Sequence, residues 1–247
     1  MFHYDMTVAH GDLSGEDFMR RCLLVSLALM LLASPCLASG SDNQLWSEIH
    51  TTTMLNNYWD FVANGQLQFG DDISELIQES FHAGFNVKVN EYLTISPTYG
   101  YFNDDPADGG NSHENRASVL ATVHLPLSGF HVSIGNEFEY RLRDPQTDSW
   151  RYRPRLTIEH PIGPSPWNLS AYLADEGFYD SEFSRFVRNR AYAGIKKKLM
   201  ENLTIDLYYM RQDDNEANPG NLNVVGLALH FHFNGAELDY RPVHSVD

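Results

Sequence analysis

Seven arginines fall at alternate positions in three stretches of the chain. Alternate residues point to the same face of a β-strand, so each stretch would place its guanidinium groups side by side. A guanidinium is a planar fork of N–H donors that binds carboxylate and phosphate groups. Glu137, Glu139 and Glu159 keep the same spacing nearby and are the predicted acidic partners. The pattern predicts a basic wall made by Arg141, Arg143, Arg151, Arg153, Arg155, Arg188 and Arg190.

Two kinds of chemistry are open to this wall. If Glu139 stands opposite Arg153 or Arg155 on a neighbouring strand, the charges form a lattice of ion pairs that fills a narrow barrel. If the arginines keep free N–H groups, they line a route that attracts a small anionic solute. The sequence leaves both interpretations open, and they can hold together.

Catalytic and metal-binding patterns are weak by comparison. His82 and Glu114 form the best acid and base pair that a hydrolase could use. No serine elbow, His-Glu zinc motif or phosphate-binding loop accompanies them. His230 and His232 could share a metal ion only with a third ligand, which the sequence does not indicate. We therefore predict no catalytic residues, no metal site and no cofactor, and a hydrolase remains an alternative function.

The residues around these charges alternate between apolar and polar with a period of two, which is typical of strands with one apolar face. The clearest run begins at Phe130, Val132 and Ile134, which alternate with polar or small neighbours. The alternation predicts ten strands, at residues 58–69, 79–90, 92–102, 112–125, 129–143, 150–160, 166–178, 186–198, 202–212 and 222–233.

The length of these strands indicates a membrane barrel. Most run about 10 to 15 residues, against a mean of roughly 5 to 6 in soluble sheets and about 9 to 11 for a tilted membrane strand. Tight turns alternate with longer polar loops, and outward aromatic residues would form a girdle at each end. The predicted fold is all-β: a closed antiparallel up-and-down transmembrane β-barrel of about ten strands, with a range of 10 to 12.

The sequence leaves open a soluble alternative to the membrane barrel and the exact number of strands. A soluble, lipocalin-like barrel of the periplasm would turn the same apolar faces inward, but it explains neither the strand lengths nor the girdles. Residues 45–51 alternate weakly and suggest a further short strand. An eleventh strand breaks the even count of bacterial barrels. This segment would then pair partially, lie inside the barrel, or signal a missed twelfth strand.

The N-terminus has the features of a secretory signal peptide. Arg20 and Arg21 precede an apolar run from Cys22 to Leu32, and small residues favour cleavage after Ala38. The run is shorter than the roughly 20 residues of a membrane-spanning helix. Residues 1–18 resemble an over-long start. Together with the barrel, the signal peptide predicts the outer membrane of a Gram-negative bacterium.

The mature chain would be acidic and without cysteine. The full chain has a net charge of −16, and four of its 33 acidic and two of its 17 basic residues precede residue 39, which leaves −14. This charge argues against nucleic acid as a partner. The expected partners are outer-membrane lipid, the barrel-assembly machinery and a small anionic solute. Cys22 and Cys36 lie in the signal peptide, so the mature chain has no thiol chemistry.

Short motifs of the chain resemble the DUF2490 family of predicted proteobacterial outer-membrane β-barrel proteins, over roughly residues 43–233. They are Trp46, the sequences at 136–141 and 151–155, Asn189-Arg190 before Gly194, and the closing stretch from Leu227 to Phe233. The resemblance implies a barrel and an outer-membrane address, with no activity to transfer. The expected organisation is a signal peptide at 1–38, a segment with a short strand at 39–57, the barrel at 58–233 and a tail at 234–247.

Overall fold

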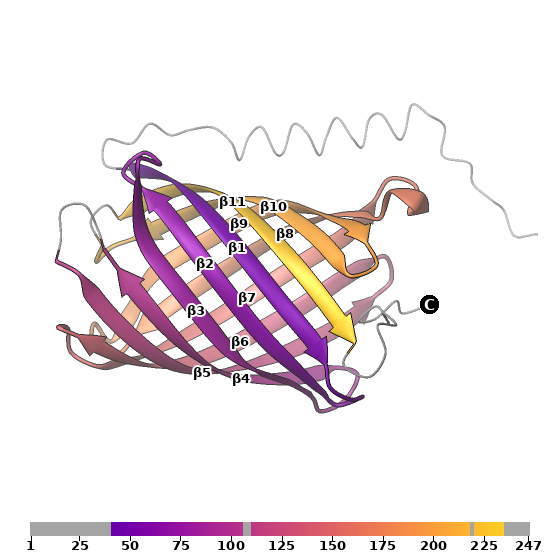
Figure 1. The fold of residues 1–247 in the computed structure, drawn as a ribbon, viewed down its shortest axis with the longest axis horizontal. Coiled ribbons are helices and arrows are strands. Elements are labelled where there is room, and N and C mark those ends of the chain that lie inside the picture. Colours follow the sequence, from indigo (N-terminus) through magenta and orange to yellow (C-terminus); the bar gives the residue numbers. More distant parts are fainter. Residues whose placement is uncertain (1–40, 106–109, 218–219, 235–247) are drawn as a thin grey trace, which may run out of the picture. The chain divides into compact units, whose positions relative to one another are not determined.

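A computed structural model of the protein describes residues 41–105, 110–217 and 220–234. The predicted signal peptide and nearly all of the C-terminal tail lie outside the described residues. The ten strands predicted from the alternation are all present, and an eleventh precedes them (Figure 1). The strands are β1 (Ser41–Met54), β2 (Trp59–Gly70), β3 (Glu75–Lys88), β4 (Leu93–Asp104), β5 (Ser112–Leu127), β6 (Phe130–Asp144), β7 (Ser149–Ile162), β8 (Leu169–Asp180), β9 (Arg185–Met200), β10 (Leu203–Asp214) and β11 (Asn221–Asn234).

The strands form a closed barrel in which each strand pairs with its neighbours in the sequence. All consecutive pairs are antiparallel, and the barrel closes where β1 pairs with β11 in parallel. This parallel pair follows from the odd strand number, because the first and last strands of an eleven-strand meander run in the same direction. Closure leaves no unpaired sheet edge.

The first strand corrects the expectation for residues 45–51. It is neither partial nor inside the barrel, and no twelfth strand is found among the described residues. It spans Ser41–Met54 and pairs along its full length with β11, from Ser41 opposite Asn221 to Met54 opposite Asn234. The barrel therefore begins at Ser41 rather than at residue 58.

The longer loops are shorter than the sequence suggested. The loop expected at 70–78 is reduced to residues 71–74, and that at 179–185 to residues 181–184. Polar residues at the strand ends continue the pairing, as where Gln68 lies opposite Gln78. The predicted contrast between tight turns and long loops is thus smaller than expected. Among the described residues the only helix is a single turn, Ser165–Trp167, and no helix is long and apolar enough to cross a membrane.

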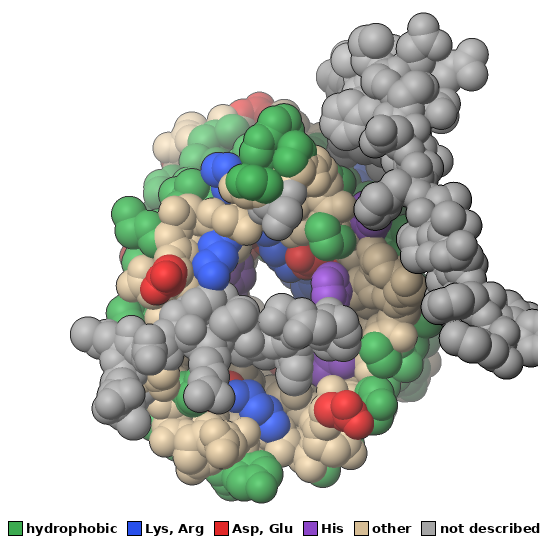
Figure 2. All heavy atoms as spheres, turned by 90° about the vertical axis from the view of Figure 1, so that its right-hand side faces the viewer, with side chains coloured by type: hydrophobic (Ala, Val, Ile, Leu, Met, Phe, Trp, Pro, Cys, Tyr) green, Lys and Arg blue, Asp and Glu red, His purple; other side chains and the backbone are tan. Residues whose placement is uncertain are grey.

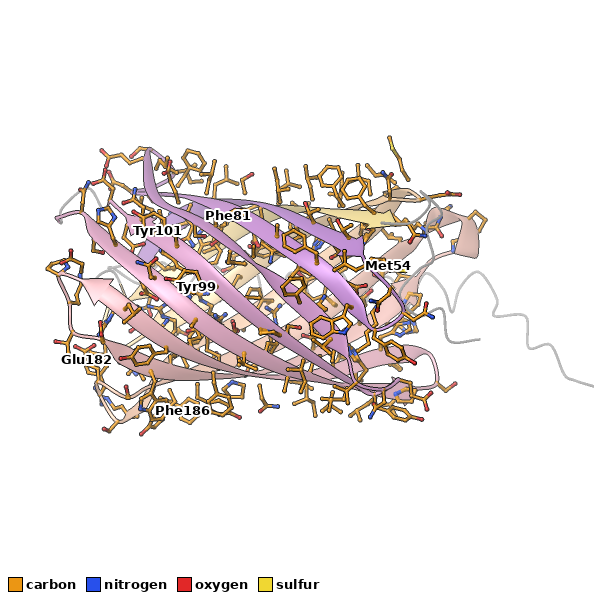
Figure 3. All side chains as sticks on the ribbon, turned by 60° about the horizontal axis from the view of Figure 1, so that its bottom comes forward. Met54, Phe81, Tyr99, Tyr101, Glu182 and Phe186 are labelled. Atoms are coloured by element: carbon orange, nitrogen blue, oxygen red, sulfur yellow. The ribbon has the colours of Figure 1, made fainter. Side chains whose placement is uncertain are left out.

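The barrel wall is apolar on its outer face and polar on its inner face, which is the reverse of a soluble barrel. Leu156 is 43% exposed on the outside, whereas its neighbour Thr157 lines the interior cavity. Most of the aromatic residues predicted to face outward are exposed, for example Trp59 and Phe130 near the turns. Phe81 and Tyr99 are exposed nearer the loops, and Figure 3 labels both. The buried residues include many charged ones, such as Glu139, Arg151 and Glu176. The polar core of this molecule is its lumen.

Candidate functional site: the charged lumen

The barrel interior contains a cavity of about 580 Å³ that is lined mainly by polar and charged side chains. A second cavity of about 510 Å³ lies on the side of the tight turns and shares Ser133, Thr157 and Lys196 with the first. Figure 2 looks into the barrel from the tight-turn end and shows a hollow centre surrounded by basic, acidic and histidine side chains. The lumen is therefore the site at which chemistry can occur.

Arg153 lies at the centre of an ion-pair lattice. Its Nη1 is 2.7 Å from Glu139 Oε1 and 3.3 Å from Glu137 Oε2, and its Nη2 is 2.8 Å from Glu176 Oε1. Glu137 of β6 lies directly opposite Arg153 of β7. Glu139 lies two residues further along β6, opposite Arg151. The predicted pairing of Glu139 with Arg153 is present, while Arg155 is not within ion-pair distance of Glu139.

A second part of the lattice lies toward the loops. The Nη2 atom of Arg141 lies 2.6 Å from Glu114 Oε2, and its Nη1 lies 3.1 Å from Asp180 Oδ2. Arg151 shares Asp180 at 3.2 Å. Arg116 binds Glu114 at 2.6 Å and Glu139 at 3.1 Å, so it joins the two parts of the lattice. The arginines of β5, β6 and β7 thus neutralise carboxylates of β5, β6 and β8, and the lattice spans four neighbouring strands.

Two members of the predicted wall reach the ends of the strands. Arg143 does not line the cavity; its Nη2 lies 2.7 Å from Glu182 in the loop between β8 and β9. Arg188 lines the cavity and is paired with Asp214 at the end of β10. The ion pairs of both residues therefore lie at the loop end of the barrel.

Arg155 and Arg190 have no carboxylate partner within 4 Å among the described residues. The guanidinium of Arg155 makes no hydrogen bond to these residues and lies over the ring of Tyr192, 4.5 Å from the centroid. Arg190 donates one hydrogen bond from Nε to Gln212, at 2.7 Å. Both side chains line the larger cavity. These two arginines fit the second interpretation of the wall, in which guanidinium groups remain available to an anion.

Phe178 is a site residue that the sequence analysis missed. It is fully buried in the lumen, and the guanidinium carbons of four arginines lie near its ring, at 4.7 Å for Arg153, 4.8 Å for Arg190, 5.4 Å for Arg188 and 5.7 Å for Arg151. The face of an aromatic ring attracts cations, so Phe178 spaces and orients the arginines. Its position two residues after the inward Glu176 was the available signal.

Glu159 differs from the other two predicted acidic partners. Lys196, not an arginine, lies 2.6 Å from its Oε2, and Ser170 donates a hydrogen bond to its Oε1 at 2.6 Å. Glu159 lies opposite His131 and Tyr172, beyond the reach of the arginines. It therefore belongs to the tight-turn side of the lumen rather than to the arginine lattice.

The acid and base pair expected of a hydrolase is not formed. Both oxygens of Glu114 bind Arg116 and Arg141, and His82 lies beside Phe102 with 6.2 Å between ring centroids. Of the other two histidines considered, His230 stacks on His50, with 4.6 Å between ring centroids. The described residues contain no cluster of three or more His, Cys, Asp or Glu that could hold a metal ion.

Tyrosine rings lie flat against the lumen wall over glycines. Tyr208 lies opposite Gly226, and a Cβ atom on that glycine would be 2.0 Å from the ring. Tyr172 covers Gly194 in the same way, with a distance of 2.5 Å. Each glycine provides the space that lets a large ring turn aside, as in the aromatic rescue of strand glycines. These pairs keep tyrosines from closing the lumen.

Fold and site together define a closed β-barrel with an apolar exterior and an arginine-rich lumen. The chain belongs to the DUF2490 family, described as "Protein of unknown function (DUF2490)", whose profile matches residues 43–223. It is 28% identical over 204 residues to the uncharacterized protein MexAM1_META1p0181 of Methylorubrum extorquens, covering 78% of this chain and 88% of that protein.

Solved structures resemble the barrel only distantly. One comes from work entitled "Unveiling the Mechanism Behind the in-meso Crystallization of Membrane Proteins", with a TM-score of 0.36, 13% identity and coverage of 71% of this chain and 76% of the other. The siderophore receptor PirA of Pseudomonas aeruginosa gives a TM-score of 0.28, with 12% identity over 68% of this chain and 34% of the receptor. At these scores the likeness carries no functional information.

Proposed function

We propose that the protein is an outer-membrane β-barrel of a Gram-negative bacterium whose lumen forms a narrow channel that favours small anionic solutes. The observation that carries the proposal is the inverted wall, apolar outside and charged inside. Large apolar side chains are exposed on the outward face of every strand from β1 to β11, among them Ile49, Phe85, Tyr99, Phe138 and Leu207. Soluble monomers rarely expose contiguous apolar patches of more than a few hundred Å², whereas a membrane barrel requires an apolar belt.

The outward apolar face also argues against the alternative of a soluble lipocalin-like barrel. Such a barrel would bury its apolar faces inside and leave charges in water. Here the inward positions carry buried charges such as Glu114 and Asp180. The eleven strands depart from the even number that is usual in bacterial barrels. The barrel nevertheless meets the requirement for insertion into a membrane. The parallel pairing of β1 with β11 closes the sheet, so no strand edge leaves its backbone N–H and C=O groups unpaired.

The preference for anions rests on the charges at the cavity. Eight lysines and arginines line it, whereas its acidic lining residues are Glu48, Asp104, Glu114 and Asp206. Charges in a narrow passage of low dielectric attract counter-ions more strongly than charges in bulk water. Anions should therefore enter more readily than cations. With the His82 and Glu114 pair absent, no contact among the described residues favours the hydrolase.

Cell fractionation and gel mobility test the address. The mature chain should be recovered with outer membranes, and it should migrate faster in SDS gels before boiling than after, because a closed barrel resists unfolding by the detergent. A chain found in the soluble periplasmic fraction, with the same mobility before and after boiling, would refute the membrane proposal.

A further inference from the structure

Arg155 and Arg190 stand out from the other lumen arginines because they face the cavity without a carboxylate within 4 Å in the part of the chain that the structure describes. They lie in one row across three strands, with Arg155 opposite Glu176 and Glu176 opposite Arg190. Neighbouring strands are about 4.8 Å apart, so the two Cα atoms are separated by roughly 10 Å on the same face. Two long guanidinium side chains at this spacing can reach a single small anion between them.

Aromatic rings hold both guanidinium groups in place. Arg155 lies over Tyr192, and Arg190 lies over both Trp46 and Phe178, at 5.0 and 4.8 Å from the centroids. A stacked guanidinium keeps its planar edge of N–H donors free for a ligand. The donors are thus ordered before a ligand arrives, which lowers the entropy lost on binding.

Glu176 does not neutralise this pair by direct contact. Its Oε1 accepts a hydrogen bond from Arg153 at 2.8 Å, and its Oε2 accepts one from the hydroxyl of Tyr192 at 3.2 Å. Both carboxylate oxygens are engaged by these neighbours. The N–H groups of Arg155 therefore remain available on the cavity side.

One part of the cavity lining, on β2 and β3, is rich in side-chain amides. Gln66, Gln68 and Gln78 from β2 and β3 line the same cavity, as do the rings of Tyr172 and Tyr208. Side-chain amides both donate and accept hydrogen bonds, which suits a body with several hydroxyl groups. The volume of about 580 Å³ lies within the range of small-molecule sites, roughly 300 to 1,000 Å³.

We propose that Arg155 and Arg190 bind the carboxylate or phosphate group of a small solute whose hydroxyl-bearing body contacts the glutamine side of the lumen. This inference deepens the proposed channel and names the class of its solute. It does not depend on conductance, because the site is complete within the folded barrel.

Calorimetric titration of the folded barrel in detergent micelles tests the site. The probes are gluconate, which carries a carboxylate, glucose 6-phosphate, which carries a phosphate, and uncharged glucose. At least one of the two anions should bind about tenfold tighter than glucose, because a hydrogen bond between charged groups is stronger than one between neutral groups. Acetate, which lacks the hydroxyl groups, should bind more weakly than gluconate.

Variants assign any binding to the two arginines. Arg155→Gln and Arg190→Gln should each weaken the binding of the preferred anion about tenfold. The matched control is Arg185→Gln, which removes the same charge from an exposed rim position and should change nothing. The melting temperature of each variant should be recorded, so that a lost fold is not mistaken for a lost site.

The outcomes separate this inference from the proposed function. Equal binding by the original chain and folded Arg155→Gln, or glucose binding as tightly as both anions, would overturn the anion site. Acetate binding as tightly as gluconate would overturn the assignment of the hydroxyl-bearing body. A barrel that conducts anions but binds none of the probes would refute the site alone. Anion binding by a chain that fractionates outside the membrane would uphold the site and refute the channel.

Discussion

Arg153 and Arg155 lie two residues apart on β7 and face the same lumen, yet their surroundings differ in kind. On β6, Arg153 lies opposite Glu137 and Arg155 lies opposite Gly135. On β8, Arg155 lies opposite Glu176, whose two oxygens bind Arg153 and Tyr192 instead. Arg153 therefore joins three carboxylates, and Arg155 stacks on Tyr192 with no ion pair among the described residues. The comparison teaches that the contacts of the nearby carboxylates, rather than the arginine itself, decide whether a lumen charge stabilises the barrel or remains available to a ligand.

Removal of the central lattice arginine should have the largest effect. Arg153→Ala removes the ion-pair partner of Glu137 and Glu176 in a buried site, while Glu139 keeps Arg116. The change should lower the free energy of unfolding by about 3 to 5 kcal/mol. Arg155→Ala breaks no ion pair and should cost much less. Urea unfolding of both variants in lipid vesicles measures the difference, and equal losses would show that the two arginines do not differ in role.

A charge placed on the outer face tests the assignment of the two faces. Leu156→Arg would put a guanidinium into lipid and should cost about 2 to 4 kcal/mol, if the residue lies near the middle of the membrane. Thr157→Arg, one residue further, points into the lumen and should be milder. The same vesicle assay applies. Comparable damage from both changes would mean that the outer face is not in contact with lipid.

The next effect concerns the tyrosines that lie over glycines. Gly226→Ala would place a Cβ atom 2.0 Å from the ring of Tyr208, so the ring must move toward the lumen. We expect a loss of about 1 to 3 kcal/mol from overpacking and a lower conductance. Gly65→Ala is the control, because its nearest neighbour would be 3.9 Å away. A Gly226→Ala barrel with unchanged stability and conductance would show that the glycine is not needed.

The sequence predicted the ten strands and their faces well because the alternation between lipid-type and lumen-type residues is a local property. It underestimated β1, in which Gln44, Glu48 and His50 face inward and a run of threonines weakens the contrast between the faces. The parallel partner of β1 lies far along the chain, as the hydrogen bond between Asn43 and Asn223 illustrates. No local pattern reports such a pairing.

The residue types of the site could be predicted, but the individual partners could not. A shift of two residues between β6 and β7 would keep every side chain on its face and would place Arg155 opposite Glu137. Arg155 would then have a carboxylate opposite it on β6, and Arg153 would lie opposite Glu139 instead of Glu137. The sequence also predicted Glu159 as a partner of the arginines, although in the structure it forms an ion pair with Lys196.

The reversal potential of the purified barrel in a planar bilayer, under a potassium chloride gradient, tests the central claim most directly. We predict an anion preference that Arg155→Gln reduces at an unchanged melting temperature and that Arg185→Gln preserves. A barrel without current, a barrel that prefers cations, or an anion preference that Arg155→Gln leaves intact would contradict the account.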